Sequence, residues 1–388
     1  MKKRYDVIVI GAGSVGQPTA FFLAKEGVKV LCIDKNASSG QGQNKAAIGG
    51  VRATHSDPAK IEICQQSLEI FSTCKERYGL DVGWKKGGYC FPVYREKEEA
   101  LFKGMLEGQK KHNLNINWEP PDRIKELIPG INPNGLRGGT YSPDDGQISP
   151  LLAAEAFETN AIENGADFLF HSEVIGLVIK QNKVCGVKTA KDTYFADIVV
   201  NAAGAYAQKI GEMAGIAIPI SHDSHEAGIS APIAEFLGPM VVDLREGDEG
   251  KTSNMYFGQN HENAIIFCYT PNPLIRGIDR RSTSEFMPTI AKRLVSIMPR
   301  FKNLQIRRLW RGLYPMTPDG FAIVGKAPKI DNFYLGVGMC GQGLMLGPGV
   351  AKNIASLILT GKPSIDEEIF KDLSPERDFY AGKAETLK

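Results

Sequence analysis

The apolar and polar positions near the start of the chain follow the order strand, turn, helix, strand. Val7 to Ile10 are all apolar, as expected for a strand that is buried on both faces. A glycine-rich turn follows, and apolar residues then recur at helical spacing until Gly27. A second apolar run, Val28 to Ile33, ends at the acidic residue Asp34. This pattern predicts a β-α-β unit with parallel strands.

The rest of the chain alternates between helical and strand-like segments. Asp57 followed by Pro58 marks a helix start, because an acidic cap and a first-turn proline both favour one. Helical spacing predicts helices over 58–79, 97–112, 122–128, 150–164, 286–298 and 350–359. Alternation predicts strands in 84–94, 168–200, 256–257, 264–269 and 333–336, the first of them a hairpin. We expect 140–148 to be rich in turns, 221–226 to be a loop, and the residues after 364 to be a mobile tail.

Composition narrows the class of protein without naming a function. A chain of 388 residues suits about two domains. The net charge of +2 gives no reason to expect a nucleic-acid partner. The 7 cysteines are scattered without C-x-x-C spacing, which is typical of reduced cysteines rather than disulfides or zinc ligands. No continuous apolar run reaches the roughly 18 residues of a membrane span. We therefore expect a cytoplasmic globular enzyme with no integral membrane segment and no metal.

The turn after the first strand has the spacing G-x-G-x-x-G. It comprises Gly11, Gly13 and Gly16, with Ser14 and Val15 between the last two. The first glycine permits the tight turn, the second lets the backbone approach a pyrophosphate, and the third lets the helix pack on the strand. The helix then offers free N–H groups to phosphates, and the acid that ends the second strand can bind ribose hydroxyls. The motif predicts a bound adenine dinucleotide but does not separate FAD from NAD.

Two later segments join this turn in a family resemblance. They are VVNAAGAYA at 199–207, and GLYPMTPDGFAIVG at 312–325 followed by NFYLGVGMCGQGLMLGPGVAKNIASLIL at 332–359. In this order and spacing the chain resembles the D-amino-acid-oxidase-like superfamily of FAD enzymes over nearly its whole length. GGVRATHSDPAKI at 49–61 and GQGLMLGPGV at 341–350 are most similar to the beta subunits of sarcosine oxidase and L-proline dehydrogenase. The resemblance implies FAD rather than NAD as the cofactor.

The resemblance also implies a fold and a set of cofactor contacts. The fold class is α/β (α+β), with an FAD-binding Rossmann-like domain interleaved with a β-sheet-rich substrate domain. We assign 1–84, 146–220 and 316–388 to the FAD-binding domain, and 85–145 and 221–315 to the substrate-binding domain. The turn at 341–345 opens a helix toward the flavin, where N–H donors stabilise negative charge on the reduced ring. The implied FAD contacts are Gly11, Gly13, Ser14, Val15, Gly16, Asp34, Lys35, Gln43, Asn44, Lys45, Ala46, Val174, Ala203, Gly204, Gly312, Gly341, Gln342, Gly343, Leu344 and Met345.

The activity that the resemblance implies is oxidation of the C–N bond of a small or secondary amino acid to an imine, by hydride transfer to flavin N5. Sarcosine, proline and glycine are the substrate types. Arg52 stands where the sarcosine-oxidase type binds the substrate carboxylate, which a planar guanidinium grips in two places; a surface or structural arginine is the alternative. Tyr314 stands where glycine oxidases and D-amino-acid dehydrogenases carry an arginine, which argues against those substrates. Tyr256 and Tyr269 either line the pocket or belong to the strand core.

Departures from the family pattern carry two further expectations. Gly312 stands where monomeric sarcosine oxidase has a cysteine joined to the flavin, so we expect noncovalent FAD. Met345 stands where that enzyme has a lysine that helps to hold the carboxylate. The stretch 264–281, where such oxidases place a lysine that promotes reaction with oxygen, has Arg276, Arg280 and Arg281 but no lysine. We therefore favour a dehydrogenase that passes electrons to a partner.

Two other activities stay open. A 2-hydroxy acid dehydrogenase would need a base near the flavin, commonly a histidine, and His55 is the histidine closest to Arg52 in the sequence. Alternatively, the chain is an FAD-carrying subunit that works only within a hetero-oligomer. The basic run 300–311 is then either a solvated strand face or a docking surface for an acidic partner subunit or electron carrier. The group His222, Asp223, His225 and Glu226 is too loosely spaced to favour a metal.

Overall fold

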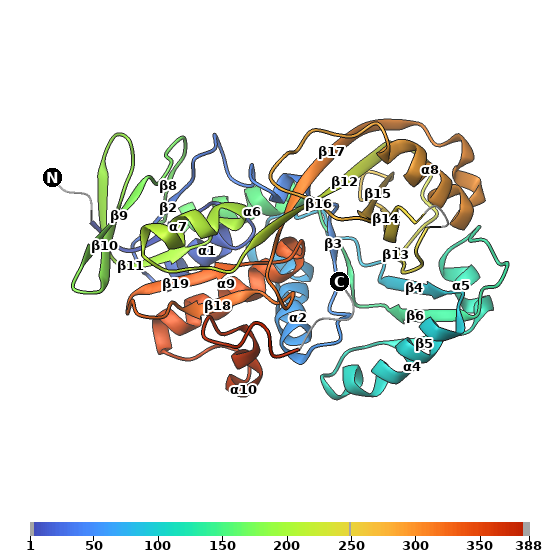
Figure 1. Ribbon diagram of the computed structural model, residues 1–388, viewed down its shortest axis with the longest axis horizontal. Helices are drawn as coiled ribbons and strands as arrows, with labels where there is room; N and C mark the ends of the chain where they lie inside the picture. The colour runs from blue at the N-terminus through green and yellow to red at the C-terminus, as the bar shows by residue number, and fades with distance from the viewer. Residues whose placement is uncertain (1–3, 248–249, 383–388) are drawn as a thin grey trace.

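Two β-sheets, one in each lobe of an elongated molecule, organise the chain in this computed structural model (Figure 1). The structure describes residues 4–247 and 250–382. Segments of the chain pass back and forth between the lobes, and the long strands β12 (Ser221–Pro232) and β17 (Ile306–Met316) run from one lobe into the other. The predicted fold class is confirmed: an α/β lobe is interleaved with a lobe rich in β-structure.

The first sheet grows from the β-α-β unit at the start of the chain. Its strand order is β18-β19-β11-β1-β2-β8, and β10 and β9 continue from β11. β1 is parallel to both of its neighbours, β2 and β11. The strands are β1 (Arg4–Ile10), β2 (Val30–Ile33), β8 (Asp167–Leu169), β9 (Gly176–Lys180), β10 (Lys183–Lys188), β11 (Thr193–Asn201), β18 (Ile323–Lys326) and β19 (Phe333–Val337).

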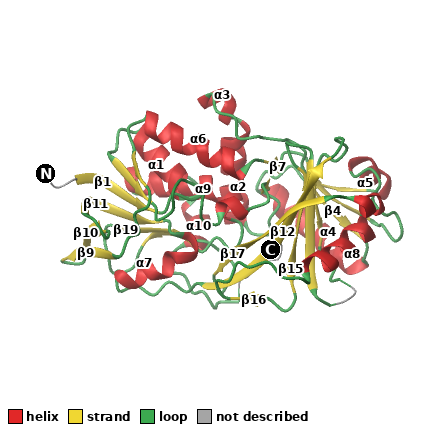
Figure 2. Ribbon diagram, turned by 90° about the horizontal axis from the view of Figure 1, so that it is seen from above, coloured by secondary structure: helices red, strands yellow, loops and turns green. Residues whose placement is uncertain are grey.

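Both faces of this sheet are covered, which explains the continuous apolar run of β1. Val7 and Val9 point into one core, together with apolar residues of the helices that gather on that face (Figure 2). Ile8 and Ile10 point into a second core that includes Ile210 of α7 (Ala207–Met213). The helices on the first face are α1 (Gly16–Lys25), α2 (Pro58–Ser72), α6 (Pro150–Glu163) and α9 (Gly343–Thr360).

α9 is long and apolar enough to qualify by composition as a membrane-spanning helix. Its mean hydropathy is 1.2 over 18 residues, but 56% of that stretch is buried inside the protein. It packs against α1 and α2. α9 is therefore accounted for as a core helix of the first lobe.

The second lobe is built on a sheet with strand order β16-β12-β15-β14-β13-β4-β6-β5, and β17 pairs with β12. Its other strands are β4 (Tyr89–Val93), β5 (Asn117–Glu119), β6 (Gly138–Ser142), β13 (Met240–Asp243), β14 (Thr252–Gln259), β15 (Ala264–Pro271) and β16 (Ile275–Arg276). Its helices are α4 (Glu96–Lys111), α5 (Pro121–Leu127) and α8 (Phe286–Ile297). A core of buried apolar side chains from β14, β15 and α8 holds the sheet and the helix together.

Short elements connect the two lobes. β3 (Gly50–Val51) pairs with β7 (Gly146–Gln147) as a small antiparallel ribbon. The predicted domain boundary between 145 and 146 lies at the start of this ribbon, and the boundary at 221 lies at the start of β12. The remaining short helices are α3 (Cys74–Tyr78), α10 (Glu367–Phe370), η1 (Asn44–Ala46), η2 (Gly204–Tyr206), η3 (Pro299–Asn303) and η4 (Lys371–Leu373).

Several local predictions were wrong. Residues 84–94 form no hairpin, because β4 pairs with β6 and β13, which lie far away in the sequence. Residues 140–148 contain most of β6 and all of β7, and 221–226 belong to β12 rather than to a loop. The helix expected over 58–79 is divided at Thr73 into α2 and α3. The turn at 341–345 opens a helix as the resemblance implied, and α9 therefore begins well before the start at 350 that helical spacing predicted.

The chain after Ser364 is folded in its described part. It forms α10 and η4, and the guanidinium of Arg377 then binds the carboxylate of Asp319 with an Nε to Oδ2 distance of 2.7 Å. Both side chains of this pair are largely buried. The prediction of a mobile tail was therefore wrong for 365–377, and its last part, 383–388, lies outside the described residues.

Candidate active site

A cavity of about 570 Å³ is lined by residues from both lobes. The first lobe contributes the glycine-rich turn, the end of β2, the loop 42–52 and the start of α9. The second lobe contributes alternate residues of β12, together with residues of β14, β15 and β17. A cavity between two structural layers, mostly apolar with a few polar groups, is typical of a small-molecule site.

The three glycines of the turn have different neighbours. Gly11 has a positive φ of 105°, and a Cβ added there would lie 2.5 Å from the carbonyl oxygen of Ala202. A Cβ on Gly16 would lie 1.8 Å from the carbonyl oxygen of Gly11, so this residue serves the packing of α1 and does not line the cavity. A Cβ on Gly13 would have nothing within 4 Å. The space beside Gly13 is therefore open, and a phosphate of a ligand can approach the backbone there.

Asp34 follows β2 directly and faces the cavity. Its Oδ2 accepts a hydrogen bond from the backbone N–H of Ala12 at 2.8 Å, and its Oδ1 accepts one from the backbone N–H of Asn36 at 2.7 Å. The carboxylate thus ties the glycine turn to the strand and holds a fixed position at the cavity wall. Lys35 and Val174 line the same cavity.

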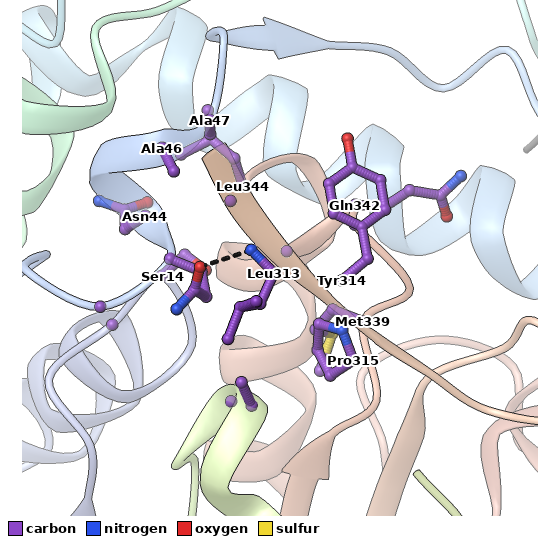
Figure 3. A pocket seen from close by; sticks show the side chains of 18 of the residues that line it. Ser14, Asn44, Ala46, Ala47, Leu313, Tyr314, Pro315, Met339, Gln342 and Leu344 are labelled. Carbon is purple, nitrogen blue, oxygen red and sulfur yellow. Dashed lines mark hydrogen bonds between the residues drawn. The ribbon is translucent and has the colours of Figure 1, made fainter. Parts of the chain in front are cut away.

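The loop at 43–46 is attached to β17 across the joint between the lobes. The Gln43 side chain accepts a hydrogen bond from the backbone N–H of Leu313 at 2.7 Å, dashed in Figure 3. The indole of Trp310 donates to the carbonyl oxygen of Ala46 at 2.9 Å. A Cβ on Gly312 would lie 2.9 Å from the Cβ of Ala46, so glycine permits this close contact. Asn44 also lines the cavity, whereas Lys45 is exposed and does not.

The start of α9 closes another side of the cavity, behind Tyr314 (Figure 3). Gly341 has a positive φ of 80°, and a Cβ there would lie 2.1 Å from the ring of Tyr314. Gln342 directly precedes the helix, and its side chain accepts a hydrogen bond from the buried ammonium of Lys60 at 2.9 Å. Gly343, Leu344 and Met345 follow along the wall. The N–H groups of a long helix therefore face the cavity, where they favour negative charge.

Arg52 is 6% exposed and lines the cavity. Its guanidinium donates to the carbonyl oxygen of Thr54 and lies 5.7 Å from the ring centre of Phe91. Tyr89 of β4 lines the cavity too, and its hydroxyl lies against Gly50, where an added Cβ would be 1.8 Å away. A buried guanidinium at the wall of a cavity is suited to a carboxylate ligand.

Three aromatic side chains lie together at the wall of the same cavity. The hydroxyls of Tyr256 and Tyr314 are 2.7 Å apart, and the ring of His225 stacks on Tyr314 with 3.8 Å between ring centres. Burial raises the pKa of both tyrosines and lowers the pKa of His225 to about 3. All three side chains are therefore neutral near pH 7. The other predicted tyrosine, Tyr269, belongs to the core and stacks on Phe286.

The sequence matches the family described as FAD dependent oxidoreductase over residues 6–357. The chain belongs to this family. The solved structure of L-proline dehydrogenase from P. horikoshii is 32% identical and has a TM-score of 0.91, with 99% of this chain and 100% of that chain covered. Sarcosine oxidase subunit beta of Arthrobacter sp is 25% identical, with 92% of this chain and 87% of that protein covered. Mouse mitochondrial sarcosine dehydrogenase is 25% identical over 93% of this chain, which spans only 40% of that protein.

The residues of this FAD-dependent oxidoreductase fit an extended dinucleotide. The open space beside Gly13 and the first N–H groups of α1 suit a pyrophosphate. Asp34 and Val174 are available to the adenosine part, and Ala203 and Gly204 also line the cavity. The start of α9 would then face the flavin ring.

Two histidines lie elsewhere than the sequence suggested: the one expected near the flavin is away from the cavity, and one expected in a loop faces it. His55 is fully buried and does not line the cavity. Burial, and then the positive charges of Arg52 and Lys60, hold the pKa of His55 well below its usual range. His225, expected in a polar loop, lies on β12 and faces the cavity. His55 is thus poorly placed as a base for a substrate in this cavity.

Sequence reasoning missed Tyr89 and misplaced His225. The signal for His225 was present, because Asp223, His225 and Ala227 follow a period of two and all line the cavity. The neighbours between them point elsewhere: the carboxylate of Glu226, for example, pairs with the guanidinium of Arg311 at 3.3 Å. Across the described residues, no group of three or more histidine, cysteine or acidic side chains could hold a metal ion.

Proposed function

We propose that this oxidoreductase oxidises the C–N bond of a small or secondary amino acid, of the sarcosine, proline or glycine type, to an imine. The observation that carries the proposal is the buried guanidinium of Arg52 in the same cavity as the neutral group of His225, Tyr256 and Tyr314. Bound FAD supplies the acceptor for the hydride equivalent. The similarity to proteins named L-proline dehydrogenase and sarcosine oxidase subunit beta supports the same substrate class.

In this proposal, different residues of the cavity contact the carboxylate and the amine of the amino acid. Arg52 binds the carboxylate and so fixes which C–H bond faces the flavin. In this proposal the neutral aromatic group of His225, Tyr256 and Tyr314 faces the amine. An amine must be uncharged to give up a hydride, and side chains that are themselves uncharged place no further charge beside it.

The state of His225 favours an amino acid over a 2-hydroxy acid. Oxidation of an alcohol needs a base for the hydroxyl proton, and an effective base has a pKa near the working pH. Burial lowers the pKa of His225 to about 3, so this ring is a weak proton acceptor. An amine that enters the cavity in its neutral form, having left its proton in solution, already carries the electron pair that drives hydride departure, so hydride transfer itself needs no such base.

Anaerobic reduction of the flavin by a panel of substrates tests the proposal. We expect sarcosine, proline or glycine to bleach the flavin absorbance of the purified chain, whereas lactate and other 2-hydroxy acids leave it unchanged. Dithionite serves as the control that the flavin is reducible. Faster bleaching by a 2-hydroxy acid would contradict the proposal. No bleaching by any amino acid until a second protein is added would favour a subunit that is active only in a hetero-oligomer.

The electron acceptor and the assembly are part of the same proposal. The lysines that line the cavity within the described residues, Lys35 and Lys209, lie with Asp34 and Glu173 at the predicted adenosine end. This supports a dehydrogenase that passes electrons to a partner subunit or carrier. Admitting air after the anaerobic reduction should therefore reoxidise the flavin slowly, and rapid reoxidation would indicate an oxidase.

All 7 cysteines are free, which agrees with the proposed cytoplasmic location.

We expect FAD to be bound noncovalently, because Gly312 offers no side chain for a covalent link. Precipitating the holoprotein with acid and filtering it should release all of the yellow colour into the filtrate. Boiled protein treated in the same way provides a second release method. Colour that stays with the denatured chain in both treatments would contradict this expectation.

A further inference from the structure

Asp145 is a buried carboxylate that lies outside the cavity wall, in the turn between β6 and β7. It is 1% exposed. Its Oδ1 accepts a hydrogen bond from the backbone N–H of Ala53 at 2.8 Å, and its Oδ2 accepts one from the hydroxyl of Thr54 at 2.7 Å. Both donors follow Arg52 directly in the sequence. The carboxylate therefore holds the backbone immediately after the side chain that faces the cavity.

Further contacts make this attachment rigid. The hydroxyls of Thr54 and Ser142 are 2.6 Å apart, and since Thr54 donates to the carboxylate, Ser142 donates to Thr54. The backbone N–H of Gly88 donates to the carbonyl oxygen of Asp145 at 2.8 Å. The ribbon of β3 and β7 pairs Val51 with Gly146, so the residues before Arg52 and after Asp145 are joined as well.

A carboxylate at this depth is costly. Burial raises the pKa of Asp145 to about 7, and the N–H of Ala53, the hydroxyl of Thr54 and the charge of Arg52 oppose that rise. An asparagine would lower the desolvation cost, but its amide has a single oxygen, whereas the carboxylate offers one oxygen to each of the two consecutive donors.

We infer that Asp145 is a positioning residue for the substrate: it holds the Ala53–Thr54 backbone and thereby sets the direction in which Arg52 presents its guanidinium to the cavity. This inference rests on the proposed role of Arg52 as the carboxylate clamp. Asp145 lies outside the cavity wall and acts through Arg52. Its removal should therefore disturb substrate binding much more than binding of FAD.

A double-mutant cycle tests the inference on the holoprotein. Asp145→Ala should raise KM for the amino acid substrate between about 10- and 100-fold, because a misdirected guanidinium loses hydrogen bonds to the substrate carboxylate that are each worth roughly tenfold in binding. The change in kcat and the FAD content should be small. In an Arg52→Ala background, adding Asp145→Ala should change KM by less than about twofold, because two residues that act as one unit are not additive.

Asp145→Asn separates geometry from charge. The amide keeps one oxygen for the Ala53 N–H and a group of similar shape for Thr54, so it should recover most of the wild-type KM. Thr54→Val removes one of the two donors and should raise KM several-fold; it takes the place of Asp145→Ala in the cycle if that variant does not fold. Asp319→Ala, which removes a buried carboxylate paired with Arg377, is the matched control and should lower thermal stability without raising KM.

The outcomes are distinct. Additive effects of Arg52→Ala and Asp145→Ala on KM would overturn the inference, as would an unchanged KM in Asp145→Ala while Arg52→Ala raises it. An equal rise in Asp145→Asn and Asp145→Ala would show that charge rather than position is what Asp145 supplies. If Arg52→Ala itself leaves KM unchanged, the clamp in the proposed function fails, and the inference falls with it.

Discussion

Replacing Arg52 with alanine is expected to weaken binding of the amino acid substrate severely while FAD stays bound. Truncating one partner of a buried charge pair costs roughly 2–5 kcal/mol, which corresponds to a rise in KM of about 30-fold or more. Arg52 is 6% exposed, so a substrate carboxylate bound to it is shielded from water. Its own loop fixes the guanidinium through the Thr54 carbonyl oxygen. The loss should appear in KM, measured by steady-state kinetics with a dye as acceptor.

The substrate can be changed in a matched way. Pyrrolidine is proline without its carboxylate, so wild-type protein should bind it much more weakly than proline. The Arg52→Ala variant should bind the two ligands about equally. Arg52→Lys, which keeps the charge but loses the planar fork, should lie between wild type and alanine. A variant that still prefers proline by the wild-type factor would exclude Arg52 as the clamp.

FAD content provides the internal control for these variants. Arg52 lies in the loop after β3, whereas the expected phosphate and adenosine contacts come from the turn at Gly11 to Gly16 and from Asp34. The ratio of flavin absorbance to protein absorbance should therefore match wild type. A colourless Arg52→Ala protein would mean that the arginine supports the cofactor rather than the substrate.

The sequence predicted best where the structure is set by neighbouring residues. The unit from β1 to β2 follows from an apolar run, three glycines at fixed spacing and an acidic end, all within a short stretch. α4, α6 and α8 were found for the same reason, since their patterns of apolar and polar residues, and the Ser149 cap of α6, are local. The interleaved fold was reached only through the family resemblance.

The misses depend on contacts between distant parts of the chain. β4 pairs with β6 and β13, and local alternation in 84–94 cannot distinguish such pairing from a hairpin. In the sequence, the start of β12 has the composition of a polar loop. Three of its residues, Asp223, His225 and Glu226, are polar although the structure buries them. A strand that lines a binding cavity lacks the apolar alternation of an ordinary strand. Alternation therefore fails to predict strands at the binding site.

The substrate side of the site shows the same limit. Arg52 could be chosen from its motif, but its setting comes from Tyr89 on β4 and from Asp145 before β7. These residues meet only because the ribbon of β3 and β7 joins two segments that are far apart in the sequence. His55 is close to Arg52 along the chain, yet its side chain is fully buried outside the cavity. His55 does contact Arg52, with 3.4 Å between its Nδ1 and Nη1 of the guanidinium, but this contact does not bring it to the cavity wall.

Two glycine substitutions in the same turn should have opposite kinds of effect. In Gly16→Ala the new Cβ would lie 1.8 Å from the carbonyl oxygen of Gly11. The clash is with backbone, so α1 must move away from β1, at a cost of about 1–3 kcal/mol or more for overpacking. In Gly13→Ala the new Cβ meets no protein atom within 4 Å. The fold should tolerate this change, but the added methyl group should occupy space that the cofactor needs and so weaken FAD binding.

Thermal unfolding with and without FAD separates the two effects. In FAD-free protein, Gly16→Ala should unfold at a clearly lower temperature than wild type, and Gly13→Ala should unfold at the wild-type temperature. With FAD in excess, wild type gains stability by RT ln(1 + [FAD]/Kd), so the deficit of Gly13→Ala should appear only then. A weakening of FAD binding by about tenfold corresponds to a deficit of about 1.4 kcal/mol. If Gly13→Ala gains as much from FAD as wild type does, the pyrophosphate does not lie against Gly13, and the cofactor must cross this turn elsewhere.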